Sequence, residues 1–401
     1  MSDENIEIEG PLTGFRILDL SRVLSGPAAT MLLADQGAEV IKVESLDGDI
    51  TRKMGTGTDG MTTFFFNTNR GKRGVGLDLK TPDGMEIVRR LIATSDVLVQ
   101  NFRPGVMEKL GLGYEAVQAI RDDIVYVSIS GFGKHGDYAH KRVYDPVIQA
   151  LSGLNELQAD GSDGRPRMMR TVIPDKTTAL MAAQAVTAAL LSRERTGKGR
   201  RVDLAMLDAT IAYIWPEGMV NLTLVDDDRE LGYGQPIQEL IFKTQDGYLT
   251  AGAMSDSEWY GLCEALEKPE WFDDPRYKTT QLRFKNADTR LAATAKIFQT
   301  KTNEHWLERL DRFSVPCAPV LSRTEVLSHP QVLANDIIRE YDQPGLGRVR
   351  QPRSAAKFQG MNAPEQPLAP RLGEHTGEVL TELGYSAAEI RRFADTDVTA
   401  G

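Results

Sequence analysis

The chain contains little cysteine, and its histidines are few and scattered. Only Cys263 and Cys317 occur among 401 residues. Two cysteines are too few for a disulfide framework, so we expect a reducing, cytoplasmic environment. None of the five histidines lies near a cysteine at the spacing of a metal-ligand pair, and the sequence therefore predicts no metal site.

Long apolar runs and excess positive charge are also missing. No run approaches the roughly 18 apolar residues that span a bilayer. The first five residues are acidic and lack the basic and apolar parts of a signal peptide. The net charge is −10, whereas general nucleic-acid binders are usually basic. We therefore expect neither a membrane nor a nucleic acid as a partner.

What the chain does have is an alternation of short apolar runs with helical patterns. Its length allows two or three domains with sizeable cores. The alternation predicts a parallel sheet with crossover helices, the doubly wound α/β arrangement. Strands are predicted at residues 15–20, 38–44, 96–100, 124–130 and 201–206.

The sequence changes character after residue 224. A charge run at 226–230 reads as an exposed linker, and residues 238–253 alternate around Asp246-Gly247 as a β-hairpin does. Helical stretches that contain tryptophan follow. We therefore expect a large domain at 1–224, a small domain at 225–325, and a return segment at 326–401 that completes the large domain.

The longest helical pattern covers residues 176–194, which are rich in Ala, Leu and Met and contain no Gly or Pro. Asp175 follows Pro174 and is predicted to be the N-cap, with Gly197 and Gly199 ending the helix. The helix dipole is expected to keep such a carboxylate ionised. The carboxylate could cap the helix or attack an electrophilic carbonyl, and this stretch alone favours capping.

Three other stretches could bind an anion. The turn at Gly26-Pro27 opens a predicted helix, although most such turns are only turns. The basic run 69–80 could cradle phosphates, but a solvated loop before a strand is the favoured interpretation. Residues 101–105 follow a predicted strand at the position where parallel sheets bind ligands.

In their order along the chain, eight runs resemble the class III CoA-transferase family, which includes formyl-CoA transferase and crotonobetainyl-CoA transferase. The resemblance extends from about Leu12 to Tyr385. The runs are LDL (18–20) with SGP (25–27), VIKVE (40–44), LDLKTP (77–82), NFRPG (101–105), the Asp175 helix with RTGKG (195–199), PEW (269–271), VPCAPV (315–320) and LGEHT (372–376).

The resemblance implies that Asp175 is the catalytic residue. Its carboxylate would attack an acyl-CoA thioester to give a mixed anhydride and then an aspartyl-CoA thioester, from which a small carboxylic acid takes the coenzyme A. The implied fold is a large Rossmann-like domain with a smaller α+β domain, and two chains would interlock like rings in a homodimer.

Further site residues follow from the same resemblance. The implied coenzyme A contacts are Leu77, Asp78, Leu79, Lys80, Asn101 and Phe102, with Arg103, Lys109 and Arg142 as cations for its phosphates. The implied substrate pocket contains Leu24, Ser25, Tyr144, Gly232, Gly234 and Gln235, and Asp145 stands where formyl-CoA transferase has a glutamate.

The sequence departs from formyl-CoA transferase at three places. Leu24 replaces a glutamine, Ser45 replaces a cofactor-binding arginine, and the glycine-rich loop is reduced to residues 232–235. These departures favour a larger acyl group than formyl, or a different lid.

Two other functions compete with CoA transfer. Related α-methylacyl-CoA racemases share the fold and use a histidine and an aspartate as a proton-transfer pair. Tyr144 occupies the position of that histidine, and His140 could replace it only by moving. A coenzyme A-binding protein without catalysis is the third interpretation.

Overall fold

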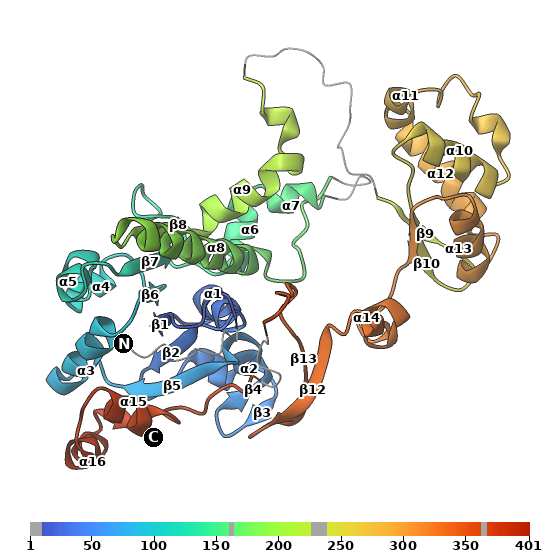
Figure 1. The fold of residues 1–401 in the computed structure, drawn as a ribbon. Helices are drawn as coiled ribbons and strands as arrows, with labels where there is room; N and C mark the ends of the chain where they lie inside the picture. Colours follow the sequence, from blue (N-terminus) through green and yellow to red (C-terminus); the bar gives the residue numbers. More distant parts are fainter. Residues whose placement is uncertain (1–9, 160–163, 226–238, 362–366) are drawn as a thin grey trace. The chain divides into compact units, whose positions relative to one another are not determined.

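The computed structural model describes residues 10–159, 164–225, 239–361 and 367–401. The chain divides into two compact units (Figure 1). One comprises Met1–Ile214 with Asp336–Gly401, and the other comprises Trp215–Asn335. Of the expected return segment, 326–401, residues 336–401 belong to the first unit and residues 326–335 to the second, and the expected small domain, 225–325, falls within the second.

The first unit is built on a seven-stranded sheet in the order β14-β5-β2-β1-β6-β7-β8. All neighbours pair in parallel except β14, which is antiparallel to β5. The strand order reverses between β1 and β6. The strands are β1 (Arg16–Asp19), β2 (Glu39–Glu44), β5 (Lys72–Leu77), β6 (Val97–Gln100), β7 (Val125–Ser130), β8 (Arg201–Ala205) and β14 (Thr399–Ala400).

All five predicted strands are confirmed, whereas β5 and β14 were not predicted. The sequence of β5 begins with Lys72 and Arg73, which conceal its apolar character. Lys72 is buried in the sheet because Asp19 of β1 lies beside it, with Lys72 Nζ 2.9 Å from Asp19 Oδ2. The favoured interpretation of residues 69–80 as a solvated loop is therefore wrong for 72–77.

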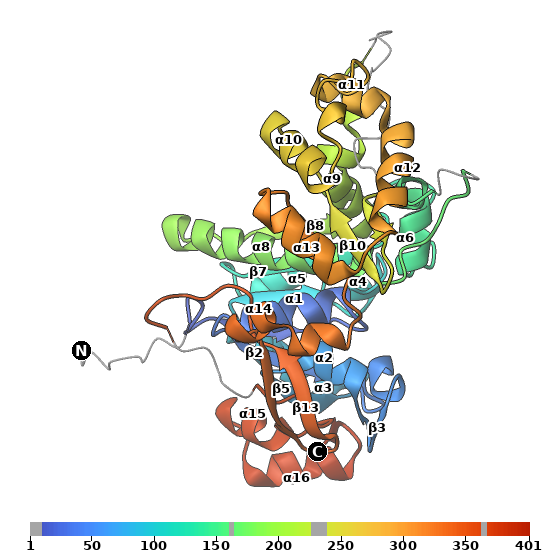
Figure 2. The same ribbon diagram turned by 90° about the vertical axis from the view of Figure 1, so that its right-hand side faces the viewer.

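Helices cover both faces of this sheet and give three layers (Figure 2). On one face, α1 (Ser25–Ala34) and α8 (Ile173–Thr196) pack through small residues, among them Ala29, Ala182 and Ala183. Alanine lets the helices approach each other and the sheet closely. On the other face lie α3 (Pro82–Ala93), α4 (Val106–Lys109), α5 (Tyr114–Ile120), α15 (Thr376–Glu382) and α16 (Ala387–Asp395).

The remaining elements of this part of the chain are short or irregular. The hairpin of β12 (Ile338–Gln343) and β13 (Gly347–Pro352) precedes the final helices. The others are η1 (Ile50–Lys53), β3 (Gly57–Thr58), β4 (Met61–Thr62), α2 (Thr63–Asn69), α6 (Asp145–Leu151), α7 (Leu154–Leu157) and α9 (Met206–Gly218).

The second unit has its own sheet and core. Strands β9 (Ile241–Lys243), β10 (Tyr248–Ala251) and β11 (Cys317–Pro319) pair antiparallel, so the predicted hairpin around Asp246-Gly247 is confirmed. Its core includes the buried Trp259, Phe298 and Trp306. The helical elements are η2 (Val220–Leu222), α10 (Asp256–Ala265), η3 (Pro269–Trp271), α11 (Thr280–Lys285), α12 (Ala287–Phe298), α13 (Asn303–Arg312), η4 (Glu325–Ser328) and α14 (Pro330–Ala334).

None of the helices in the described residues is both long enough and apolar enough to cross a membrane.

Candidate active site

Asp175 lies in the first turn of α8, which begins at Ile173 with Val172 as its N-cap. The prediction that Asp175 is the N-cap is therefore wrong. Pro174 explains the earlier start, because proline is favoured in the first turn, where its missing N–H has no intrahelical partner. The predicted end is confirmed, since Gly197 adopts the left-handed conformation that closes the helix, with φ of 66°.

The Asp175 carboxylate interacts with the first residue of another helix. The hydroxyl and the backbone N–H of Ser25, which opens α1, lie close enough to this carboxylate to favour its ionised form. Helices α1 and α8 pack directly against each other. Leu24, the N-cap of α1, is buried and supplies an apolar side chain next to Ser25. The structure thus brings three predicted site residues together.

Asp145 holds the backbone of Asp175 from the other side. Its Oδ2 accepts the Asp175 N–H at 3.1 Å, and its Oδ1 accepts Gln149 Nε2 at 2.6 Å. Asp145 and Gln149 are only 2% and 1% exposed. Gln149 also donates to the Thr171 carbonyl at 3.2 Å and accepts the Met169 N–H at 3.0 Å. These bonds fasten the segment before α8 to α6.

Gln149 was not predicted as a site residue. The only sequence signal is its position four residues after Asp145, which places both side chains on one face of a helix.

The electrostatics of Asp175 differ from the expectation. Burial, followed by the negative charge of Asp145, raises its pKa from 3.8 to about 6, although the hydroxyl and N–H of Ser25 lower it. Burial also raises the pKa of Asp145. The helix N-terminus therefore does not hold the pKa of Asp175 at its usual value, because the loss of hydration and a like charge raise it. Asp175 is still mostly ionised at neutral pH.

The predicted coenzyme A contacts lie at the carboxyl ends of the parallel strands. Leu77 ends β5, and Asp78, Leu79 and Lys80 follow it. Asn101 and Phe102 follow β6, whereas Leu24 and Ser25 follow β1. Because the strand order reverses between β1 and β6, this edge is where open parallel sheets form a ligand crevice.

The predicted phosphate-binding cations point to solvent. Arg103, Lys109 and Arg142 are exposed, and none forms an ion pair within the described part of the chain. Tyr144 is 69% exposed and is the N-cap of α6. Gly232, Gly234 and Gln235 lie outside the described residues.

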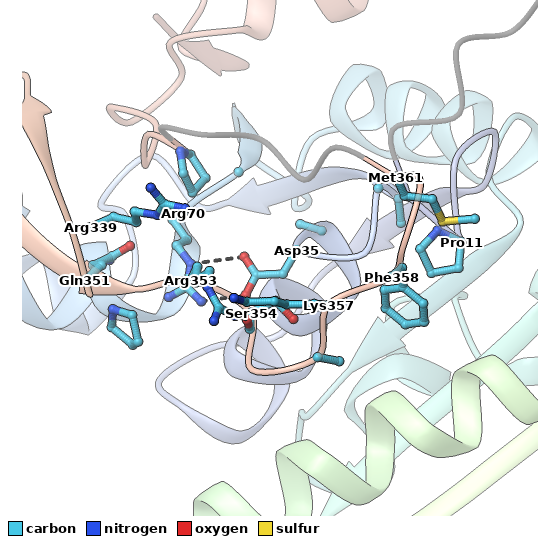
Figure 3. A pocket seen from close by; sticks show the side chains of 18 of the residues that line it. Pro11, Asp35, Arg70, Arg339, Gln351, Arg353, Ser354, Lys357, Phe358 and Met361 are labelled. Carbon is cyan, nitrogen blue, oxygen red and sulfur yellow. Dashed lines mark hydrogen bonds and ion pairs between the residues drawn. The ribbon is translucent and has the colours of Figure 1, made fainter. Parts of the chain in front are cut away.

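A cavity of about 840 Å³ lies at the opposite end of α1 (Figure 3). An ion pair between Arg70 and Asp35 lines it, with Arg70 Nη2 2.5 Å from Asp35 Oδ2. Arg339, Arg353 and Lys357 of the return segment surround this pair in Figure 3. The cavity is separate from Asp175, because Asp35 follows the last residue of α1 whereas Ser25 is the first.

Among the residues that the structure describes, no three His, Cys, Asp or Glu side chains form a group that could hold a metal ion. The arrangement that the structure does provide is a partly buried carboxylate at the N-terminus of a long helix, close to the N-terminus of a second helix. Such a carboxylate can act as a nucleophile, and nearby N–H groups can stabilise oxyanions.

Comparison with known proteins gives consistent matches. A family model described as CoA-transferase family III matches residues 12–376. The chain is 36% identical over 388 residues to succinyl-CoA:glutarate CoA-transferase of Mus musculus, covering 96% of this chain and 89% of that protein. It is 32% identical to formyl-CoA:oxalate CoA-transferase of Escherichia coli, covering 95% and 97%.

A solved structure agrees with these sequence matches. The crystal structure of a CAIB/BAIF family protein from Brucella suis matches with a TM-score of 0.80 and 32% identity, covering 94% of this chain and 100% of that one. Each match spans nearly the whole chain, so the relation includes the mostly parallel sheet, the Asp175 helix and the second unit.

Proposed function

The chain belongs to CoA-transferase family III and is an enzyme of that class, and we propose that it transfers coenzyme A between carboxylic acids through covalent intermediates on Asp175. The observation that carries this proposal is the position of the Asp175 carboxylate. The carboxylate is partly buried and lies close to the hydroxyl and N–H of Ser25, which favour its ionised form, and the Asp175 backbone N–H is held by Asp145.

The proposed reaction begins when an Asp175 oxygen attacks the carbonyl carbon of an acyl-CoA thioester. The C–S bond breaks, which leaves a mixed anhydride and the coenzyme A thiolate. The thiolate then attacks the aspartyl carbonyl and releases the donor acid, so that Asp175 carries coenzyme A as a thioester. The acceptor acid attacks this thioester, and the returning thiolate attacks the acceptor's acyl carbon, which frees the new acyl-CoA and Asp175.

The surroundings of Asp175 fit these steps. Each tetrahedral intermediate carries an oxyanion that needs nearby donors, and the N-terminus of α1 offers N–H groups beside the carboxylate. The apolar side chain of Leu24 helps to keep water from the anhydride. The raised pKa makes Asp175 a more basic nucleophile than an exposed aspartate, while about 6 is low enough for ionisation at pH 7.

We further propose that coenzyme A binds at the carboxyl edge of the sheet. Leu77, Asp78, Leu79 and Lys80 would line it at the end of β5, and Asn101 and Phe102 at the end of β6. Arg103, Lys109 and Arg142 have no ion-pair partner among the described residues and could therefore pair with phosphates.

The proposals about domains, oligomeric state and cellular location rest on family membership. They are a Rossmann-like large domain at 1–224 completed by 326–401, a small α+β domain at 225–325, an interlocked homodimer and a cytoplasmic location. Light scattering at micromolar concentration tests the dimer, because a monomeric mass would contradict it.

The substrate proposal concerns the acyl group. Leu24 stands where formyl-CoA transferase has a polar glutamine by its active site. An apolar side chain at this position favours an acyl chain with apolar carbons over formyl or oxalyl. The similarity to succinyl-CoA:glutarate CoA-transferase is consistent with acids of four or five carbons.

The function is tested by incubating the protein with each of several acyl-CoA thioesters and a panel of free acids, and by following the new thioester by liquid chromatography. CoA transfer with ping-pong kinetics supports the proposal. No transfer, together with deuterium exchange at the α-carbon of a branched acyl-CoA, would contradict it and favour the racemase.

A pH profile tests the role of Asp145. The nucleophile must be ionised, so kcat/KM for the acyl-CoA is expected to fall below a pH of about 6, where Asp175 becomes protonated. Asp145→Asn removes the like charge that raises the Asp175 pKa, while its amide oxygen can still accept the Asp175 N–H. The acid limb should therefore move to lower pH.

The matched control for this profile is Asp288→Asn, the same change in the exposed first turn of α12. Its acid limb should coincide with that of the unmodified enzyme. An Asp145→Asn profile with the same midpoint would contradict the assigned electrostatics.

Arg142 is expected to contribute to coenzyme A affinity. Arg142→Ala should raise KM for the acyl-CoA roughly 10-fold with kcat little changed, because one charge-assisted hydrogen bond contributes about 1.5 kcal/mol. Arg195→Ala is the control, since Arg195 is an exposed cation in the last turn of α8. Equal KM values for the two variants would exclude Arg142 from the binding site.

A further inference from the structure

The turn between β1 and α1 contains a strained residue two positions before Ser25. Val23 has φ of 69°, in the left-handed region. A β-branched residue rarely adopts this conformation, because its side chain collides with the neighbouring backbone. Such a conformation persists only where surrounding contacts hold it.

Two side chains hold the backbone at this point. Asn101 Oδ1 accepts the Arg22 N–H at 2.8 Å, and Asn101 Nδ2 donates to the Arg22 carbonyl at 2.7 Å. Asp49 Oδ2 accepts the N–H of Val23 itself at 3.1 Å. Arg22 and Val23 thus have three of their backbone polar groups bonded to side chains from distant parts of the sequence.

Two buried lysines bond to backbone carbonyls on either side of this turn. Lys42 Nζ of β2 donates to the Ser21 carbonyl at 3.0 Å, and Lys72 Nζ of β5 donates to the Pro27 carbonyl at 2.8 Å. Glycine at position 26 allows the backbone to pass close to Ser21, because a Cβ at this position would lie 2.3 Å from the Ser21 Cβ.

The lysines have buried counter-ions. Lys72 Nζ lies 2.9 Å from Asp19 Oδ2, and Lys42 Nζ lies 3.6 Å from Asp49 Oδ2. All four side chains are at most 1% exposed. Charges without water are expensive to bury, and apolar residues of similar volume would often stabilise a fold as well. These charges do something that apolar residues cannot, since they bond to the backbone of the turn.

We propose that Asn101, Asp49, Lys42 and Lys72 form a clamp that holds residues 21–27 in the strained conformation and thereby positions Ser25 against the Asp175 carboxylate. The four are positioning residues, and the inference rests on the proposed role of Asp175. The family resemblance assigns the Asn101 side chain to coenzyme A. In this structure its oxygen and its amide nitrogen both bond to the backbone of Arg22.

The clamp has a consequence for the nucleophile. If the turn relaxes at Val23, Ser25 moves with it, and Asp175 loses the neighbouring hydroxyl and N–H that favour its ionised form. The Asp175 pKa then rises above its present value, and the acid limb of the pH profile moves up. A residue with a purely structural role would not move that limb.

The test is a double-variant cycle of Asn101→Ala and Val23→Gly in the full chain. Asn101→Ala alone should lower kcat about 10- to 100-fold, since small misplacements of reacting groups have effects of this size. It should also shift the acid limb upward. Glycine adopts the left-handed conformation without strain, so Val23→Gly should restore at least half of the lost kcat when added to Asn101→Ala, on a logarithmic scale.

Two outcomes would overturn the clamp. One is a double variant as impaired as Asn101→Ala. The other is an effect confined to KM, which would mean that Asn101 acts only through coenzyme A binding and does not position Ser25. Should Asn101→Ala fail to fold, Asp49→Ala replaces it in the same cycle, because it removes the acceptor of the Val23 N–H.

Failure of the proposed function would look different. In that case the unmodified protein would transfer coenzyme A from no thioester. The same cycle measured by urea unfolding then still tests the clamp. Val23→Gly should recover part of the unfolding free energy that Asn101→Ala loses, because glycine needs no clamp to adopt the left-handed conformation. A double variant no more stable than Asn101→Ala would contradict the clamp.

Discussion

Replacing Asp175 by asparagine is expected to lower kcat/KM for CoA transfer by on the order of 10⁴-fold, because the covalent route is lost with the nucleophile. Asparagine has nearly the same shape, so the packing of α8 on α1 should persist. Initial rates with the preferred acyl-CoA and acid measure the effect. Asp288→Asn, in the exposed first turn of α12, should leave the rate unchanged.

Asp175→Asn should also be more stable than the unmodified enzyme above pH 6. The pKa of Asp175 is raised from 3.8 to about 6 in the folded protein, so folding disfavours its ionised form. The free energy of unfolding therefore falls as pH rises from about 4 to about 6 and stays lower above that range. Asparagine does not ionise, and the free energy of unfolding of Asp175→Asn should therefore lack this fall.

An Asp175→Asn variant that retains more than a tenth of the activity would contradict the nucleophile assignment.

Replacing Arg52 by methionine is expected to lower the free energy of unfolding by about 3–5 kcal/mol, because it leaves Glu44 as an unpaired buried charge. The Arg52 and Glu44 side chains are 4% and 2% exposed, and Arg52 Nη2 lies 2.7 Å from Glu44 Oε1. Arg52 also donates to the Pro370 carbonyl at 3.0 Å and lies over the Phe65 ring, 3.6 Å from its centroid. One side chain thus joins β2, α2 and the return segment.

Urea denaturation at pH 7.5 measures this loss. The control is Arg90→Met, since the Arg90–Glu86 pair is about half exposed at both side chains, and such pairs contribute roughly 0–1 kcal/mol. A loss below 1 kcal/mol for Arg52→Met would mean that the Glu44 carboxylate finds water, and that this pair does not hold the return segment.

Much of the fold could be predicted from the sequence, because strands with continuous apolar runs are recognisable on their own. The strand β5 was missed because its leading Lys72 is neutralised only by Asp19, 53 residues earlier in the chain. No local pattern reveals such a pairing. The predicted end of α8 at Gly197 is correct, since left-handed glycine is a local signal.

The candidate site, like the fold, could be predicted from the sequence only in part. Asp175 could be selected from its position and from the family resemblance, and the structure brings Ser25 and Leu24 next to it. The raised pKa could not be predicted, because it depends on burial and on Asp145, which lies 30 residues away. Gln149 and Asp49 could not be recognised either, since their function is to bond to the backbone of segments distant in sequence.

The central claim is that Asp175 becomes covalently modified during transfer. Its most direct test is mass spectrometry of the intact protein and of the Asp175 peptide after incubation with acyl-CoA thioesters and a hydroxylamine or borohydride trap. The account predicts a hydroxamate or an alcohol on Asp175, and the thioester that gives the most adduct identifies the donor. A protein that transfers coenzyme A while its Asp175 peptide stays unmodified under every trap would contradict the account.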